Sequence, residues 1–156
     1  MLVLLSGIEP QRKILEDKLI KQFKNYPKKI IFVRGVLNEV EKITNTKNIK
    51  FVNFLSQKKL AQTIVNSKLV LARSGYSTIM DLASLQKKVF FIPTSGQTEQ
   101  EYLAKHLEEL KISPFTTQNS FKLAMLKRVE NYTGFNQHIN ITDLDFSLFS
   151  IKKTAF

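Results

Sequence analysis

The sequence predicts an α/β fold, a Rossmann-like parallel sheet with helices on both faces. Four short apolar runs, at residues 2–5, 30–33, 69–72 and 89–92, have the length and continuity of buried parallel strands, and residues 49–54 are predicted as a further strand. Helical patterns separate most of these runs, and strands that alternate with helices build a parallel sheet. Ligands in such sheets bind beyond the carboxyl ends of the strands. The turns that follow the runs are therefore the first places to look for a site.

The helices are predicted from apolar residues that recur with helical spacing. After the turn at Ser6-Gly7, a helix begins near Pro10, because proline is tolerated in a first turn. Leu15, Leu19 and Phe23 then mark its buried stripe. Further helices are expected over 57–66, 76–85, 99–110 and 121–129, whereas 36–48 has no clear pattern. The 156 residues are consistent with one domain, in which the tail from about 131 shows no period.

Composition narrows the class of protein. Without cysteine the chain has no disulfide, thiolate metal site or cysteine nucleophile. No apolar run reaches the roughly 18 residues that indicate a transmembrane helix, and the apolar start lacks the basic region of a signal peptide. We expect a cytoplasmic protein. The net charge of +11 suits an acidic ligand, an anionic membrane surface or nucleic acid, or simply a lysine-rich solvated surface. Scattered lysine pairs and the lack of a nucleic-acid-binding motif make nucleic acid an unlikely partner.

The stretch from Ala72 to Ala104 contains two successive units of strand, polar turn and helix start. Helix N-termini favour anions because their N–H groups are unpaired and the helix dipole is positive there. In the first turn, Arg73-Ser74-Gly75, the glycine permits a close backbone approach, and Arg73 either reaches a phosphate or props the loop through a salt bridge. Ser77 and Thr78 either donate to phosphate or cap the helix.

Two acidic side chains follow these turns, and each has two interpretations. Asp81 could accept hydrogen bonds from a ribose diol, or it could complete a capping box with Thr78. Gln100 and Glu101 could read sugar hydroxyls, or Thr98 and Glu101 could form a second capping box. Spacing alone favours the caps in both cases.

Other polar residues give weaker signals. Arg12 and Arg34 are expected at the surface, and His106 is expected to pack in the core. With His138 in the unassigned tail, the two histidines do not make a metal site, and no metal is expected. The sequence offers no persuasive general base, so the catalytic residues stay unassigned.

The residues from Arg73 onward carry a family resemblance. R-S-G-Y-S-T-I-M-D, a strand that ends in I-P, and G-Q-T-E-Q-E-Y-L-A resemble the donor-binding half of GT-B glycosyltransferases, in particular the family of the UDP-N-acetylglucosamine transferase of peptidoglycan lipid II synthesis. That family's pattern is roughly R-x-G-A-x-T-x-x-E, then I-P, then Q-x-x-N-A. The opening L-L-S-G-I-E-P-Q-R resembles the first strand and loop of the same C-terminal domain. Tyr76 replaces the alanine of the pattern, Leu103 the asparagine near the sugar, and Gly7 is the one glycine of the first loop.

The resemblance implies a domain that binds a nucleotide sugar. The donor would be a UDP-sugar such as UDP-N-acetylglucosamine, used by an inverting glycosyltransferase that needs no metal or cofactor. Asp81 would hold the ribose, the first loop and the Gly75–Thr78 turn would face the diphosphate, and Leu55 would lie near the uracil. Gln100 and Glu101 would face the sugar. The full set of implied contacts is Ser6, Gly7, Leu55, Arg73, Ser74, Gly75, Ser77, Thr78, Asp81, Gln97, Gln100 and Glu101.

GT-B enzymes also have an N-terminal domain that binds the acceptor, and nothing in these 156 residues corresponds to it. The expectation is therefore a fragment, or the donor-binding subunit of a split enzyme, that pairs with an acceptor-binding domain or subunit. Association with the inner face of a membrane would fit such a role. The alternatives are part of a UDP-sugar 2-epimerase, which shares the GT-B architecture, and a basic nucleic-acid-binding domain.

Overall fold

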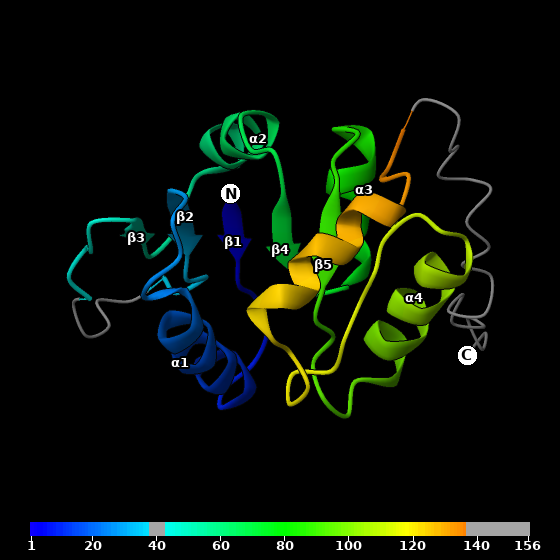
Figure 1. The fold of residues 1–156 in the computed structure, drawn as a ribbon, viewed down its shortest axis with the longest axis horizontal. Coiled ribbons are helices and arrows are strands. Elements are labelled where there is room, and N and C mark those ends of the chain that lie inside the picture. Colours follow the sequence, from blue (N-terminus) through cyan, green and yellow to red (C-terminus); the bar gives the residue numbers. More distant parts are fainter. Residues whose placement is uncertain (38–42, 137–156) are drawn as a thin grey trace, which may run out of the picture.

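The computed structural model describes residues 1–37 and 43–136, in which five parallel strands form a single sheet in the order β3-β2-β1-β4-β5 (Figure 1). This strand order is that of a Rossmann fold, and it confirms the predicted fold class. The elements in chain order are β1 (Leu2–Leu4), α1 (Gln11–Phe23), β2 (Ile30–Val33), β3 (Ile49–Val52), α2 (Gln57–Val65), β4 (Val70–Ala72), α3 (Tyr76–Ser84), β5 (Val89–Phe91), α4 (Thr98–Glu109) and the 3₁₀-helix η1 (Leu123–Asn131).

Strand β1 occupies the centre of the sheet. Leu2 pairs with Ile31 of β2 on one side and with Val70 of β4 on the other. Because both faces of this strand are covered, Leu2 and Val3 are fully buried, as the continuous apolar run predicts.

Helices cover both faces of the sheet, so the apolar residues of alternate strand positions form two separate clusters. The first contains Leu2, Val70 and Ala72 with residues from α2, α3 and α4. The second contains Val3 and Leu71 with residues from α1 and η1. Figure 1 shows η1 crossing in front of β5. The described residues contain no helix that is long and apolar enough to cross a membrane.

Helix α1 buries the predicted stripe of Leu15, Leu19 and Phe23, each at most 1 % exposed. The segment after α4 differs from the prediction, because an α-helix was expected over 121–129 and a 3₁₀-helix forms instead. Its buried residues, Leu126 and Val129, are three positions apart. That spacing places them on the same side of a helix with three residues per turn.

A buried ionic cluster ties α1 to the sheet and corrects the expectation that Arg12 and Arg34 lie at the surface. The two arginines are 3 % and 1 % exposed, and both contact Glu16, which is fully buried. Arg34 donates from Nε and Nη2 to the two carboxylate oxygens of Glu16, at 3.0 Å each. Arg12 donates to Glu16 and also to the backbone carbonyl of Arg34. Arg12 also donates to the exposed Glu9, so the two arginines of the cluster are balanced by two acids.

The pKa of the Glu16 carboxyl reflects this surrounding. Burial by itself would raise that pKa, but the hydrogen bonds and charges of Arg34 and Arg12 outweigh burial and hold the pKa below its ordinary value. Glu16 therefore remains ionised between its two arginines.

His106 was expected to be a packed core residue, and the structure shows it only half-buried. Its ring stacks on Tyr102 one turn earlier in α4, with 5.9 Å between the ring centroids. His138 lies outside the described residues.

Candidate functional site

Three loops meet at the carboxyl edge of the sheet. A Cβ atom on Gly7, in the loop after β1, would lie 3.8 Å from the hydroxyl of Thr94 in the loop after β5. A Cβ atom on Gly75, in the loop after β4, would lie 4.0 Å from the side-chain amide of Gln100. The loops after β1, β4 and β5 are thus neighbours, and they lie where ligands bind in open α/β sheets.

The N-terminus of α3 opens toward this junction. Gly75 is the N-cap residue with an extended backbone, and no side chain caps the helix. Ser77 is exposed and Thr78 is half-buried in the first turn, and Ser6 and Gly7 are exposed in the loop after β1. An uncapped helix start beside a glycine-containing loop is a suitable place for an anion.

The structure rules out the capping box that spacing favoured for Asp81. Because α3 already begins at Tyr76, Thr78 is within the first turn and Asp81 is in the second turn. Asp81 is exposed, and its carboxylate makes no cap hydrogen bond. The side chain is therefore available to a ligand.

The second predicted capping box is also wrong as a reciprocal pair, because Gln97 and not Thr98 is the N-cap residue of α4. Glu101 nevertheless reaches back and accepts a hydrogen bond from the Gly96 N–H at 3.1 Å. Gln100 accepts one from the Thr94 N–H at 2.9 Å and donates to the side chain of Gln97. Gln100 and Glu101, the two side chains expected to contact the sugar, thus hold the loop after β5.

Arg73 and Ser74 are buried beneath the loops, at 1 % and 0 % exposure. The guanidinium of Arg73 donates to the carbonyl oxygens of Ile92, Pro93 and Gln11, and to the side chain of Gln118 at 2.6 Å. Within residues 1–37 and 43–136 Arg73 does not make the salt bridge that was considered for it, because each of these acceptors is an uncharged oxygen. The loss of hydration on burial lowers the pKa of Arg73 to about 10.

Ser74 has a similar supporting role, since its hydroxyl donates to the carbonyl oxygen of Gln100 at 2.7 Å. Arg73 and Ser74 thus fasten the loop after β4 to α1, to β5 and to α4. Neither side chain is exposed to a ligand in this structure. Leu103, which stands where the family pattern has asparagine, is also fully buried and lies in the apolar cluster under α4.

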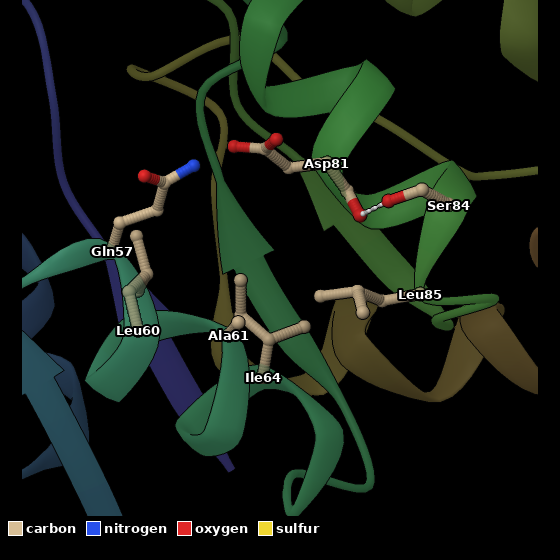
Figure 2. A pocket seen from close by; sticks show the side chains of 7 residues that line it. All are labelled: Gln57, Leu60, Ala61, Ile64, Asp81, Ser84 and Leu85. Carbon is tan, nitrogen blue, oxygen red and sulfur yellow. Dashed lines mark hydrogen bonds between the residues drawn. The ribbon is translucent and has the colours of Figure 1, made fainter.

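Asp81 borders a cleft between α2 and α3 with a volume of about 210 Å³. The lining residues are Gln57, Leu60, Ala61, Ile64, Asp81, Ser84 and Leu85. Figure 2 shows the side-chain amide of Gln57 and the carboxylate of Asp81 directed toward each other at one end of this cleft. Leu55, just before α2, is half-buried and packs against the same apolar cluster as Ile64.

Sequence reasoning missed Gln57 as a site residue. The only available signal was its place at the start of a helix after a predicted strand, which puts it at the carboxyl edge of the sheet. Thr94 was predicted only to lie in the polar turn after the strand at 89–92. Its buried hydroxyl has no hydrogen-bond partner among the described residues and lies beside Gly7.

Gly35 supports the site from the loop after β2. It has φ +71°, and a Cβ atom there would lie 2.3 Å from the carbonyl oxygen of Leu5, just before the first loop. Gly35→Ala is therefore expected to lower the free energy of unfolding by about 2–4 kcal/mol, because it adds a backbone clash to the cost of a positive φ. Urea denaturation measures this loss.

Gly96→Ala is the matched control, because Gly96 has φ +82° and no atom within 4 Å of the added Cβ. It should lose only the conformational part, about 1 kcal/mol. Equal losses in the two variants would show that the clash with Leu5 does not contribute to the lower free energy of unfolding of Gly35→Ala.

The sheet order defines a Rossmann-like α/β domain, and comparison with known proteins identifies the family. Residues 8–133 match the model of the glycosyltransferase family 28 C-terminal domain. The chain belongs to this family. None of the curated proteins matches the sequence.

Solved structures share the fold at low sequence identity. The glycosyltransferase SnogD from Streptomyces nogalater has a TM-score of 0.63 and 13% identity, with 82% of this chain and 34% of SnogD covered. MurG from Acinetobacter baumannii has a TM-score of 0.61 and 15% identity, with 85% of this chain and 42% of MurG covered. The glycotransferase of kitacinnamycin has a TM-score of 0.65 and 13% identity, with coverages of 82% and 32%. The chain thus spans between 32% and 42% of the length of these proteins, and its fold is that of a GT-B glycosyltransferase domain.

Proposed function

We propose that this chain binds the UDP-sugar donor of an inverting glycosyltransferase. The observation that carries the proposal is the arrangement on α3, whose uncapped N-terminus faces the loop junction and whose Asp81 carboxylate borders the cleft beside α2. Family membership supports the same role. The uridine base, the inverting stereochemistry and the independence from metals and cofactors come from the resemblance of Arg73–Ala104 to the lipid II transferase family.

The spacing along α3 suits a nucleoside diphosphate. From Tyr76 to Asp81 the helix rises by about 7–8 Å, at about 1.5 Å per residue. A diphosphate at the N-terminus of α3 would place the ribose one turn further along, where Asp81 can accept hydrogen bonds from its hydroxyls. Backbone N–H groups aimed at the diphosphate would stabilise the charge that develops on it when the glycosidic bond breaks.

The sugar would then lie toward the loop after β5. Gln100 is next to Gly75, and its amide could exchange its present contacts with Thr94 and Gln97 for sugar hydroxyls. Glu101, which accepts from the Gly96 N–H, could do the same. N-acetylglucosamine is the sugar that the resemblance favours.

The remaining parts of the reaction would come from a partner. We propose that an acceptor-binding domain or subunit faces the carboxyl edge of the sheet and supplies the catalytic base, so that the chain alone binds UDP but transfers nothing. A cytoplasmic location at the inner face of a membrane remains part of the proposal.

The test is a thermal-shift panel of UDP and UDP-sugars, in which the wild-type chain is expected to be stabilised in a concentration-dependent way. Asp81→Ala should weaken UDP binding by about 10- to 100-fold, because it removes hydrogen bonds to a charged group that contribute about 1.5–3 kcal/mol. Dissociation constants from titration of the shift give this ratio.

Asp17→Ala provides the control, since Asp17 is also an exposed acid on a helix but pairs with Lys13 on α1. It should leave UDP binding unchanged. If UDP produces no shift in the wild-type chain, or if both variants bind UDP as the wild type does, the proposed function is wrong.

A further inference from the structure

The cleft between α2 and α3 has a polar end and an apolar end. Gln57 and Asp81 form the polar end, at the carboxyl edge of the sheet, and Ile64 and Leu85 are among the residues that form the rest (Figure 2). Its volume of about 210 Å³ is below the roughly 300–1,000 Å³ of a site for a whole drug-sized ligand. The cleft thus suits one part of a nucleotide, with the remainder outside.

The two polar side chains face each other from different helices. Gln57 is the first residue of α2 and Asp81 is in the second turn of α3, and both are exposed. Figure 2 shows the amide nitrogen of Gln57 on the side nearer the Asp81 carboxylate. Among the described residues neither side-chain group has a hydrogen-bond partner, although one is a donor and the other an acceptor. A small group that both donates and accepts could bridge them.

A ribose hydroxyl has this chemistry, because it carries one donor hydrogen and two acceptor lone pairs. Its hydrogen can go to the Asp81 carboxylate while its oxygen accepts from the Gln57 amide. A carboxylate alone can satisfy only the donor half of such a hydroxyl. Gln57 therefore adds a contact that Asp81 cannot make.

In the proposed orientation of the nucleotide, the 2′-hydroxyl is the ribose hydroxyl that would lie toward Gln57. With the diphosphate at the N-terminus of α3, the 5′ side of the ribose is nearest α3. The 1′ side, with the base and the neighbouring 2′-hydroxyl, is then directed toward α2 and Gln57.

We propose that Gln57 is a specificity-determining residue that binds the ribose 2′-hydroxyl together with Asp81 and so selects ribonucleotides over 2′-deoxyribonucleotides. This inference rests on the proposed function, since it assumes that the diphosphate binds at α3. It adds to that function a residue from α2 and a choice of sugar in the nucleoside.

The experiment compares the dissociation constants of UDP and 2′-deoxy-UDP, from NMR titration of the whole chain. The wild type should bind UDP more tightly. Gln57→Leu should lower the ratio of the 2′-deoxy-UDP dissociation constant to the UDP dissociation constant by about 3- to 10-fold, which is the effect of one hydrogen bond. It should do so by weakening the binding of UDP and leaving the binding of 2′-deoxy-UDP unchanged. Gln57→Glu, which keeps the size but cannot donate, should lower the ratio at least as much.

Gln62→Leu is the control, because Gln62 is exposed on the same helix and does not line the cleft. Its ratio should equal that of the wild type. Equal binding of UDP and 2′-deoxy-UDP by the wild type, or an unchanged ratio in Gln57→Leu, overturns the inference while UDP binding itself still supports the proposed function. A wild-type chain that binds neither nucleotide contradicts both.

Discussion

Glu16→Gln should lower the free energy of unfolding by about 3–5 kcal/mol, measured by urea denaturation at pH 7. Glu16 is fully buried and accepts hydrogen bonds from Arg12 and Arg34, which are themselves at most 3 % exposed. Glutamine has nearly the same shape but no charge, so Arg34 would remain buried without a counter-ion and Arg12 would keep only its pair with the more exposed Glu9. The loss should thus be electrostatic, with little change in packing volume.

The neighbouring acid gives the control. Asp17 is exposed, and in the part of the chain that the structure describes its ion-pair partner is Lys13, so Asp17→Asn should cost less than about 1 kcal/mol. The advantage of wild type over Glu16→Gln should also depend on pH. Because the folded-state pKa of Glu16 is held below its ordinary value of 4.5, that advantage is complete above pH 4.5 and is lost as the pH falls through the folded-state pKa. An advantage that persists unchanged in acid would contradict the ionic account.

Arg73→Met should lower the free energy of unfolding by about 3 kcal/mol or more, because it removes the donors of four hydrogen bonds at once, three of them buried. An unsatisfied buried carbonyl costs about 1–3 kcal/mol, and methionine fills much of the same space without donating. Arg73→Lys should also be destabilising, since a single ammonium cannot reproduce the planar fork that reaches Ile92, Pro93 and Gln118. Urea denaturation of the two variants measures the effect.

Arg128→Met tests whether the burial of Arg73 causes this loss. Arg128 has comparable partners, the Glu108 carboxylate and the Phe115 carbonyl, but its side chain is 40% exposed. Its replacement should cost about 1 kcal/mol, because water can satisfy the groups left behind. Similar losses at positions 73 and 128 would contradict the account.

The sequence was sufficient to predict the sheet, because four of the five strands are short uninterrupted apolar runs between turn residues, and β3 is interrupted only by Lys50. The stripe of Leu15, Leu19 and Phe23 likewise fixed the buried face of α1. The strand order could not be read from these local patterns, since it depends on pairings such as Leu2 with Val70. The 3₁₀ geometry of η1 was also missed, because spacings of three and four residues look alike in a short apolar segment.

The loops of the candidate site were predictable, because glycines mark them in the sequence. The contacts of its side chains were less predictable. Gly7 and Gly75 indicated the loops that meet, and Asp81 was considered for the ribose. The environment of Arg34 and Arg73 was not predictable, because they gain their partners from residues distant in sequence, whereas Arg12 pairs with Glu9 and Glu16 at helical spacing. Asp81 was first interpreted as part of a capping box with Thr78, although the helix predicted over 76–85 begins two residues earlier and already places Thr78 in its first turn. Gln57 faces Asp81 only after α2 and α3 have packed.

The central place of β1 has a kinetic consequence. Leu2 pairs with Ile31 and with Val70, so the first strand must find one partner nearby in the chain and another much further along. The unit of β1, α1 and β2 can assemble early, because its strands are close in sequence. The pairing of β4 and β5 with this unit requires long loops to close, so conformational entropy is lost before the new contacts stabilise the chain. The half of the sheet that contains β4 and β5, whose following loops carry Gly75 and Thr94, is therefore the half that we expect to form late.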